Sequence, residues 1–260
     1  MFRINKKLNG KLGRVGVIET PHGVIETPAF VVVGTKGTVK ALTPEQVKDL
    51  GTQVILANTY HLYLQPGDEK VKKMGGLGKM MNWGGPTMTD SGGFQAFSLG
   101  VAYGEKIGKV TKNPPQPLLY KGGEFKGVDL KLAKITEDGV EFKSIIDGST
   151  HFFTPEKSIE IQHNIGADII FAFDECTSPL ASYEYQKEAM ERTHRWAERS
   201  LTTHKLLNFD RLTLKGSDTA RNLTTCSLFG IIQGGRFEDL RKESAKVISR
   251  LGLAHRGGGF

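Results

Sequence analysis

Short apolar runs alternate with amphipathic segments along most of the chain. The runs occupy residues 28–33, 53–57, 86–88, 167–173 and 228–232. Thr43-Pro44 and Thr154-Pro155 open two of the intervening helices, each with a capping threonine and a proline at the first helical position. Continuous apolar strands that alternate with helices are typical of a parallel sheet covered on both faces. We therefore expect a single α/β domain over residues 1–260.

Four of these runs end in a polar side chain. The four residues are Asn58, Asp90, Asp174 and Gln233. In parallel α/β folds the site is built from residues at the carboxyl ends of the strands. Each residue alone could simply cap the helix that follows it. Together they predict one mouth at which all four side chains converge.

Asp90 begins the stretch Asp90-Ser91-Gly92-Gly93-Phe94. The two glycines allow a ligand to approach the backbone closely, and the turn exposes the carboxylate as an acid, a base or a hydrogen-bond acceptor. The Phe94 ring is a candidate stacking surface for a flat ligand. The alternative is a surface turn with a capping aspartate.

Two acids and a glutamine around one mouth suit a purine base. Asp174 can accept hydrogen bonds from adjacent N–H groups on a guanine edge, and Gln233 can both donate and accept on the oxygen-bearing side. Asp90 is then available for proton transfer. Exchange of a base at a glycosidic bond needs two carboxylates, one that handles protons and one that attacks the sugar carbon.

The charge balance favours a polyanionic partner such as nucleic acid. The formal net charge is +7 and the isoelectric point is about 9.3. Basic residues gather near the end of the chain at Arg236, Arg241, Lys242, Lys246, Arg250 and Arg256. Acids alternate with several of them, so an ion-paired helix face explains the same pattern.

Hydropathy and cysteine content exclude several classes of protein. No stretch resembles a membrane span or a secretory signal, so we expect a cytoplasmic protein with no membrane partner. The only cysteines are Cys176 and Cys226, which argues against a disulfide framework. Without a Cys-x-x-Cys motif or a nearby histidine pair, they predict no metal site in this chain.

Three segments depart from the alternation. Two copies of Gly-Val-Ile-Glu-Thr-Pro predict an antiparallel hairpin at about 12–30, with His22 in its turn. Residues of about 101–134 are expected to form an insertion on the rim, and residues of about 208–225 a polar connector.

Six ordered motifs resemble those of one family, the bacterial-type tRNA-guanine transglycosylases (queuine tRNA-ribosyltransferases). They begin at Asn58, Asp90, Phe142, Ser158, Ala172 and Phe229. The resemblance implies a TIM-like (β/α)₈ barrel that exchanges guanine at the tRNA wobble position for the queuine precursor preQ1 or queuine. It also implies that Asp90 is the proton acceptor and that Asp174 and Gln233 read the purine. Ser91, Gly92, Gly93 and Phe94 would line the base pocket, with Cys176 beside it or simply a small buried residue.

The resemblance weakens after Gly252. The family continues into a strand that closes the pocket, the nucleophilic aspartate, the remaining barrel strands and a Cys/Cys/Cys/His zinc site. We therefore expect a C-terminally truncated chain with an incomplete barrel, no cofactor of its own and no base exchange by itself. The implied partners are tRNA and guanine or preQ1, with a possible homodimer in the full-length form. A non-catalytic tRNA-binding accessory subunit and an archaeosine-type relative remain as alternatives.

Overall fold

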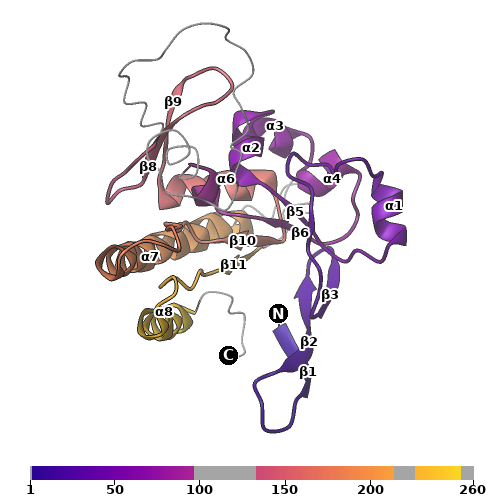
Figure 1. Cartoon of the computed structure of the whole chain (residues 1–260). Coiled ribbons are helices and arrows are strands. Elements are labelled where there is room, and N and C mark those ends of the chain that lie inside the picture. Colours follow the sequence, from indigo (N-terminus) through magenta and orange to yellow (C-terminus); the bar gives the residue numbers. More distant parts are fainter. Residues whose placement is uncertain (1, 97–132, 214–225, 253–260) are drawn as a thin grey trace, which may run out of the picture.

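The structure is a computed structural model that describes residues 2–96, 133–213 and 226–252 (Figure 1). The insertion expected at 101–134 therefore lies outside the described residues, except for its last two, which begin strand β7.

A parallel sheet of five strands forms the centre of the described part. In spatial order the strands are β11 (Ser227–Phe229), β10 (Ile169–Phe171), β6 (Thr87–Thr89), β5 (Ile55–Ala57) and β4 (Val32–Val33). Every neighbouring pair is parallel. Because all five strands run in the same direction, their carboxyl ends share one edge of the sheet. The prediction of an α/β fold with a parallel sheet is confirmed.

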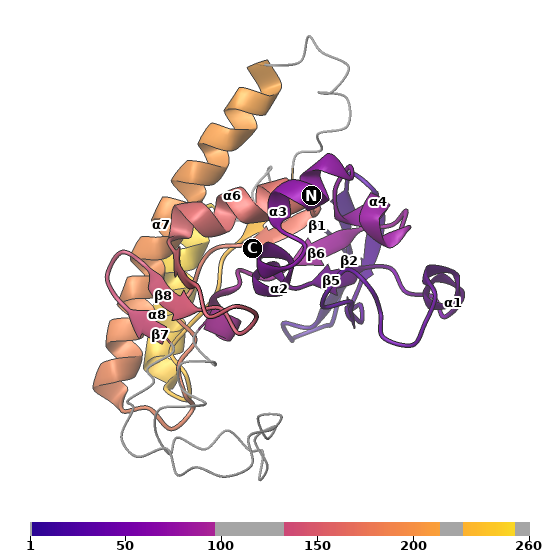
Figure 2. The same cartoon turned by 90° about the horizontal axis from the view of Figure 1, so that it is seen from above.

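Helices follow or precede these strands, as the alternation predicts. Their bounds are α1 (Pro44–Asp49), α2 (Thr59–Leu64), α3 (Asp68–Lys73), α4 (Leu77–Met81), α6 (Pro155–Ile165), α7 (Tyr183–Thr213) and α8 (Glu238–Arg250). Thr43 forms a full capping box with Gln46, and the Thr154 side chain accepts from the Lys157 amide. Helix α6 packs against α3 and α7, and α7 packs against α8 (Figures 1 and 2).

Helix α7 is longer than the sequence predicts. It continues to Thr213, so the connector expected from residue 208 onward begins inside a helix, and that boundary is wrong. Asn208, the first residue of the expected connector, lies within the helix, and its side chain is 3.0 Å from Nε2 of His204 one turn earlier.

The repeat near the N-terminus forms an antiparallel hairpin of β2 (Arg14–Thr20) and β3 (Gly23–Thr27), and β1 (Phe2–Lys7) adds a third strand. Nδ1 of His22, in the turn, lies 2.8 Å from Oδ1 of Asp168, whose side chain is fully buried. The other Asp168 oxygen accepts from the Thr87 amide at 2.8 Å. The hairpin is thus attached at the amino ends of β6 and β10, opposite the polar tips.

A second antiparallel sheet, which the sequence did not predict, lies at the other end. It consists of β7 (Ala133–Ile135), β8 (Val140–Lys143) and β9 (Thr150–Phe153). Phe142 and Phe153 are buried in the main core, with their ring centroids 4.9 Å apart in an edge-on arrangement. A Cβ added to Gly92 would lie 3.1 Å from the Phe153 ring, so this sheet packs directly behind the Gly-Gly turn.

Candidate functional site

The carboxylate of Asp90 lies at the end of β6 and accepts several hydrogen bonds. Oδ1 accepts from the backbone amides of Thr59 at 2.9 Å and Gly92 at 3.2 Å, and Oδ2 accepts from the Asn58 side chain. Asn58 also caps helix α2, since its Oδ1 accepts from the His61 amide at 3.2 Å. Asn58 is therefore both a helix cap and a partner of Asp90. The two roles considered for it are compatible.

Burial raises the pKa of Asp90 to about 6, against the opposing effect of the hydrogen bonds from Thr59 and Gly92. A carboxyl group with a pKa close to neutrality is ionised at pH 7 and still binds a proton readily. Asp90 can therefore accept a proton from a bound ligand and return it at little free-energy cost.

Asp174 connects the loops that follow three strands. Its Oδ1 accepts from the Ser91 hydroxyl at 2.9 Å, and its Oδ2 accepts from Nε2 of Gln233 at 2.8 Å. Each carboxylate oxygen can accept a second hydrogen bond. The pKa of Asp174 is also raised, to about 6, because burial and the charge of Asp90 outweigh the hydrogen bonds from Ser91 and Gln233. The charge of Asp90 thus acts on Asp174, in the loop after the neighbouring strand.

The glycines of the turn are needed for this close approach. Gly92 has a φ of +79°, which side chains rarely adopt. A Cβ on Gly93 would lie 2.7 Å from the backbone oxygen of Asp174, closer than van der Waals contact permits. Glycine at position 93 therefore lets the loop after β6 contact the loop after β10.

Two residues of helix α6 hold the loop and the strands in place. The Ser158 hydroxyl donates to the backbone oxygen of Ser91 at 2.7 Å. Gln162 accepts from the Phe171 amide at 2.9 Å and from the Thr89 hydroxyl at 3.1 Å, and it donates to the Phe171 oxygen at 2.9 Å. Sequence analysis placed Ser158 at the start of a family motif that also contains Gln162, but assigned neither residue a role. Their spacing of four, which puts both on one helix face, was a signal that could have found them.

Gln233 is oriented through its backbone. Its amide donates to the Ser244 hydroxyl at 3.0 Å, and Nε2 of His194 lies 3.0 Å from the same hydroxyl. Gly234 follows with a φ of +119°, and a Cβ there would lie 2.6 Å from the Arg241 nitrogen. The first turn of α8 therefore packs against the Gln-Gly-Gly loop and fixes the direction of the Gln233 side chain.

Neighbouring residues of the motifs have different roles. Glu175 is fully buried and forms an ion pair with Arg192, and it accepts from the Tyr185 hydroxyl at 2.6 Å, so it supports the loop. Cys176 is half-buried. The Phe94 side chain is 44% exposed, which leaves a substantial part of its surface accessible beside the acids.

The sequence model of the family described as "Queuine tRNA-ribosyltransferase" matches residues 9–114 and 105–259. The chain belongs to the queuine tRNA-ribosyltransferase family. A queuine tRNA-ribosyltransferase of Thermoanaerobacter pseudethanolicus is 47% identical over 245 residues, which are 94% of this chain and 53% of that protein. That of Staphylococcus aureus is 45% identical over 92% of this chain and 51% of its own length.

The match extends to an archaeal relative. A protein of Archaeoglobus fulgidus named "Putative queuine tRNA-ribosyltransferase" is 45% identical over 258 residues, which are 98% of this chain and 59% of that protein. The chain thus spans about half the length of the curated relatives it matches. Asp90, Asp174 and Gln233 all lie within the residues that the family model covers.

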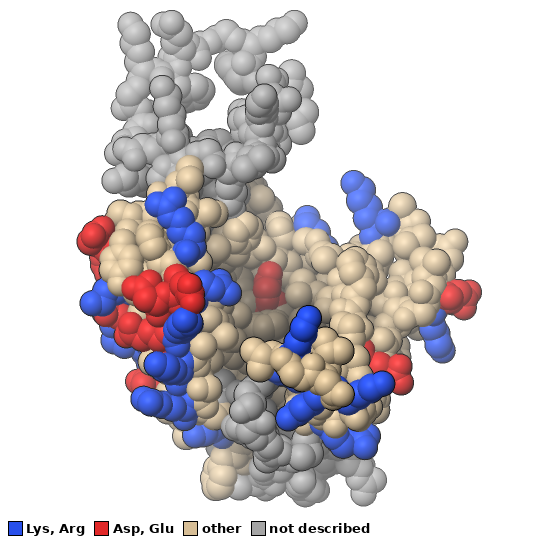
Figure 3. Space-filling view, turned by 60° about the horizontal axis from the view of Figure 1, so that its bottom comes forward, with Lys and Arg blue, Asp and Glu red and all other residues tan. Residues whose placement is uncertain are grey.

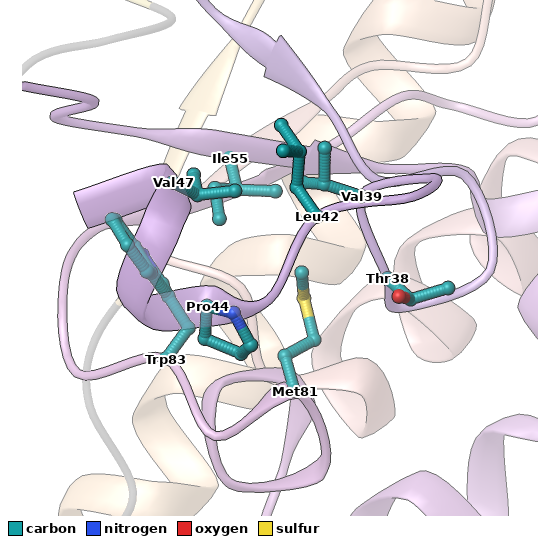
Figure 4. Close-up of a pocket in the computed structure, with 8 residues that line it drawn as sticks. All are labelled: Thr38, Val39, Leu42, Pro44, Val47, Ile55, Met81 and Trp83. Carbon is teal, nitrogen blue, oxygen red and sulfur yellow. The ribbon is translucent and has the colours of Figure 1, made fainter. Parts of the chain in front are cut away.

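An apolar pocket lies elsewhere, between α1 and the sheet (Figure 4). Its lining consists of Thr38, Val39, Leu42, Pro44, Val47, Ile55, Met81 and Trp83. Only Thr38 and Trp83 have polar side-chain atoms, and Nε1 of Trp83 donates to the Pro86 oxygen at 3.0 Å. The pocket shares no residue with the mouth formed by the acids and contains no group suited to proton transfer.

The basic cluster predicted near the end of the chain lies mainly on α8, and Arg256 falls outside the described residues. Lys242 forms an ion pair with Glu238 one turn earlier, and the Arg236 guanidinium lies 5.2 Å from the Phe237 ring centroid. On the face shown in Figure 3, acidic side chains lie among basic ones toward the left of the view. The ion-paired alternative therefore holds for at least part of the cluster.

None of the helices in the described ranges is long and apolar enough to cross a membrane.

Proposed function

We propose that this chain forms the base-binding part of a tRNA-guanine transglycosylase, which exchanges guanine at the tRNA wobble position for preQ1 or queuine. The observation that carries the proposal is the contact of Ser91 and Gln233 with the two oxygens of Asp174, beside Asp90. This arrangement leaves acceptor capacity on Asp174 and both kinds of hydrogen-bonding atom on Gln233. These are the groups that a guanine edge requires.

In this proposal each residue has a separate role. Asp174 accepts from the N–H groups of guanine, and Gln233 binds the edge that carries the oxygen. The ring of Phe94 stacks on the base, and Ser91, Gly92 and Gly93 line the pocket. Asp90 accepts the proton that the incoming base loses when it bonds to the ribose, because its raised pKa of about 6 suits proton transfer near neutrality.

Base exchange with retention of the ribose configuration also needs a carboxylate that attacks the sugar carbon. In this proposal Asp90 transfers the proton and Asp174 binds the base, so neither residue is assigned the attack on the sugar carbon. We therefore propose that the 260-residue chain binds the base but does not exchange it alone. The TIM-like barrel and the homodimer belong to the same proposal, as features of a full-length family member.

The zinc site of the family does not fit the residues present. Three cysteine ligands are needed, and this chain has two cysteines, Cys176 in the loop after β10 and Cys226 directly before β11. No step of the proposed reaction depends on zinc.

Two measurements with the purified chain test the proposal. Calorimetric titration with guanine and with adenine is expected to give binding of guanine only, and Asp174→Ala is expected to abolish it. The matched control is Asp49→Ala, an exposed position at the end of α1. Guanine binding unchanged by Asp174→Ala would remove Asp174 from the site.

The second measurement follows labelled guanine into tRNA. We expect no incorporation with this chain alone. Robust incorporation would refute the proposal that the chain binds the base without exchanging it. Binding of tRNA without binding of guanine would instead support an accessory subunit.

A further inference from the structure

We propose that His163, His204 and Cys226 bind a Zn²⁺ ion at the amino-terminal edge of the sheet, away from the acids. The three residues come from three elements: His163 from α6, His204 from α7, and Cys226 from the position directly before β11. Asp90 follows the other end of β6, in the same parallel sheet. The metal site is therefore separate from the base pocket.

The distances between the ligand atoms suit a tetrahedral ion. Nε2 of His163 lies 3.0 Å from Nδ1 of His204, and Sγ of Cys226 lies 3.7 Å from Nε2 of His163. The three ligand atoms all lie within 4.8 Å of one another. With Zn–N of about 2.05 Å and Zn–S of about 2.3 Å, tetrahedral geometry requires about 3.3 Å between nitrogens and about 3.6 Å between nitrogen and sulfur. The two separations measured from Nε2 of His163 are therefore within a few tenths of an ångström of these values.

The environment also suits a metal site. The side chains of His163, His204 and Cys226 are 4%, 9% and 7% exposed. One thiolate with two neutral imidazoles is a ligand set that selects Zn²⁺ over Mg²⁺ or Ca²⁺, which prefer oxygen. The fourth position would be filled by water, as in other sites with three protein ligands.

Asn208 supplies the orienting partner that a ligating histidine needs. If Nδ1 of His204 binds the metal, its Nε2 carries a proton and must donate it. Nδ2 of Asn208 lies 3.0 Å from this nitrogen, while the buried Oδ1 of Asn208 has no hydrogen-bond partner among the described residues. A rotation of the amide by 180° exchanges the two atoms and lets Oδ1 accept from His204. Outer partners of this kind fix the ring and the tautomer of a metal-binding histidine.

The expectation of no metal site was based on motif spacing, which does not detect ligands that are far apart in the chain. His163 and His204 are 41 residues apart, and Cys226 is 63 residues from His163, so only the packing of α6, α7 and β11 brings them together. A bound ion would attach the start of β11 to both helices. Its role would be structural, because it lies at the amino end of β11, whereas Gln233 follows the carboxyl end.

Cobalt titration of the reduced full chain, produced without a histidine tag, tests the proposal. Co²⁺ is expected to bind at one equivalent, with tetrahedral ligand-field bands and a thiolate-to-cobalt charge-transfer band, and Zn²⁺ is expected to displace it. Cys226→Ser should remove the charge-transfer band, and the matched control Cys176→Ser should retain it. Asn208→Leu should weaken binding about 10- to 100-fold while keeping the spectrum.

A second readout uses the wild-type chain and does not depend on the folding of any variant. Zn²⁺ is expected to slow the modification of the Cys226 thiol by an alkylating reagent, and a chelator should restore the rate, while Cys176 reacts equally in both conditions. Absence of the charge-transfer band in the wild type, its survival in Cys226→Ser, or alkylation of Cys226 unaffected by Zn²⁺ would each show that the cluster is only a hydrogen-bonded one.

Discussion

The affinity of the chain for guanine should depend on pH through Asp174. Guanine N–H groups need an ionised carboxylate as acceptor, and the pKa of Asp174 is raised to about 6 by burial and by the charge of Asp90. The ionised form therefore prevails above pH 6 and the protonated form below it.

The size of the effect follows from the ionised fraction. With a pKa of about 6, roughly nine tenths of Asp174 is ionised at pH 7 and roughly one tenth at pH 5, so the apparent affinity should fall about tenfold between these values. Asp174→Asn should bind guanine more weakly at pH 7 and show little change down to pH 5, because its side chain does not titrate.

Calorimetric titration with guanine at several pH values between 5 and 8 measures this effect. Asp49→Asn, on the exposed end of α1, should follow the wild type throughout. Asp90→Asn offers an internal test, because loss of the neighbouring charge should lower the pKa of Asp174 and move the midpoint to lower pH. An affinity that is constant from pH 5 to pH 8 in the wild type would refute the reasoning. So would a loss of affinity in Asp174→Asn with the same midpoint pH as in the wild type.

Three further predictions concern the packing that forms the site. Gly93→Ala should reduce guanine affinity at least tenfold in the same titration, because its Cβ would lie 2.7 Å from the Asp174 backbone, whereas Gly84→Ala, with no atom within 4 Å, should bind normally. Asp168→Ala should lower the free energy of unfolding in urea by about 2–4 kcal/mol, since it leaves the Thr87 amide and His22 without their buried acceptor, and a loss equal to that of exposed Asp49→Ala would contradict this. Because the folded-state pKa of Asp174 is raised, its stabilising contribution is complete below the unfolded pKa of about 3.9 and is lost as pH rises through about 6. The free energy of unfolding of the wild type relative to Asp174→Asn should therefore fall by about 2 kcal/mol between pH 4 and pH 7, and a rise over this range would reverse the assigned sign.

The sequence by itself determined the parallel sheet and the convergence of its polar tips. Strand direction follows from the alternation of apolar runs with helices, and parallel strands necessarily bring their carboxyl ends to one edge. Asn58, Asp90, Asp174 and Gln233 could therefore be placed at one mouth before any coordinates, and hydrogen bonds join Asn58 to Asp90 and Gln233 to Asp174.

Only the tertiary structure decided the interactions between residues with no regular spacing. The attachment of His22 to Asp168 depends on how the hairpin docks under the sheet. The grouping of His163, His204 and Cys226 depends on the packing of two helices against the edge strand. Such contacts join residues far apart in the chain, and local periodicity carries information about which face a residue occupies but not about which distant residue it meets.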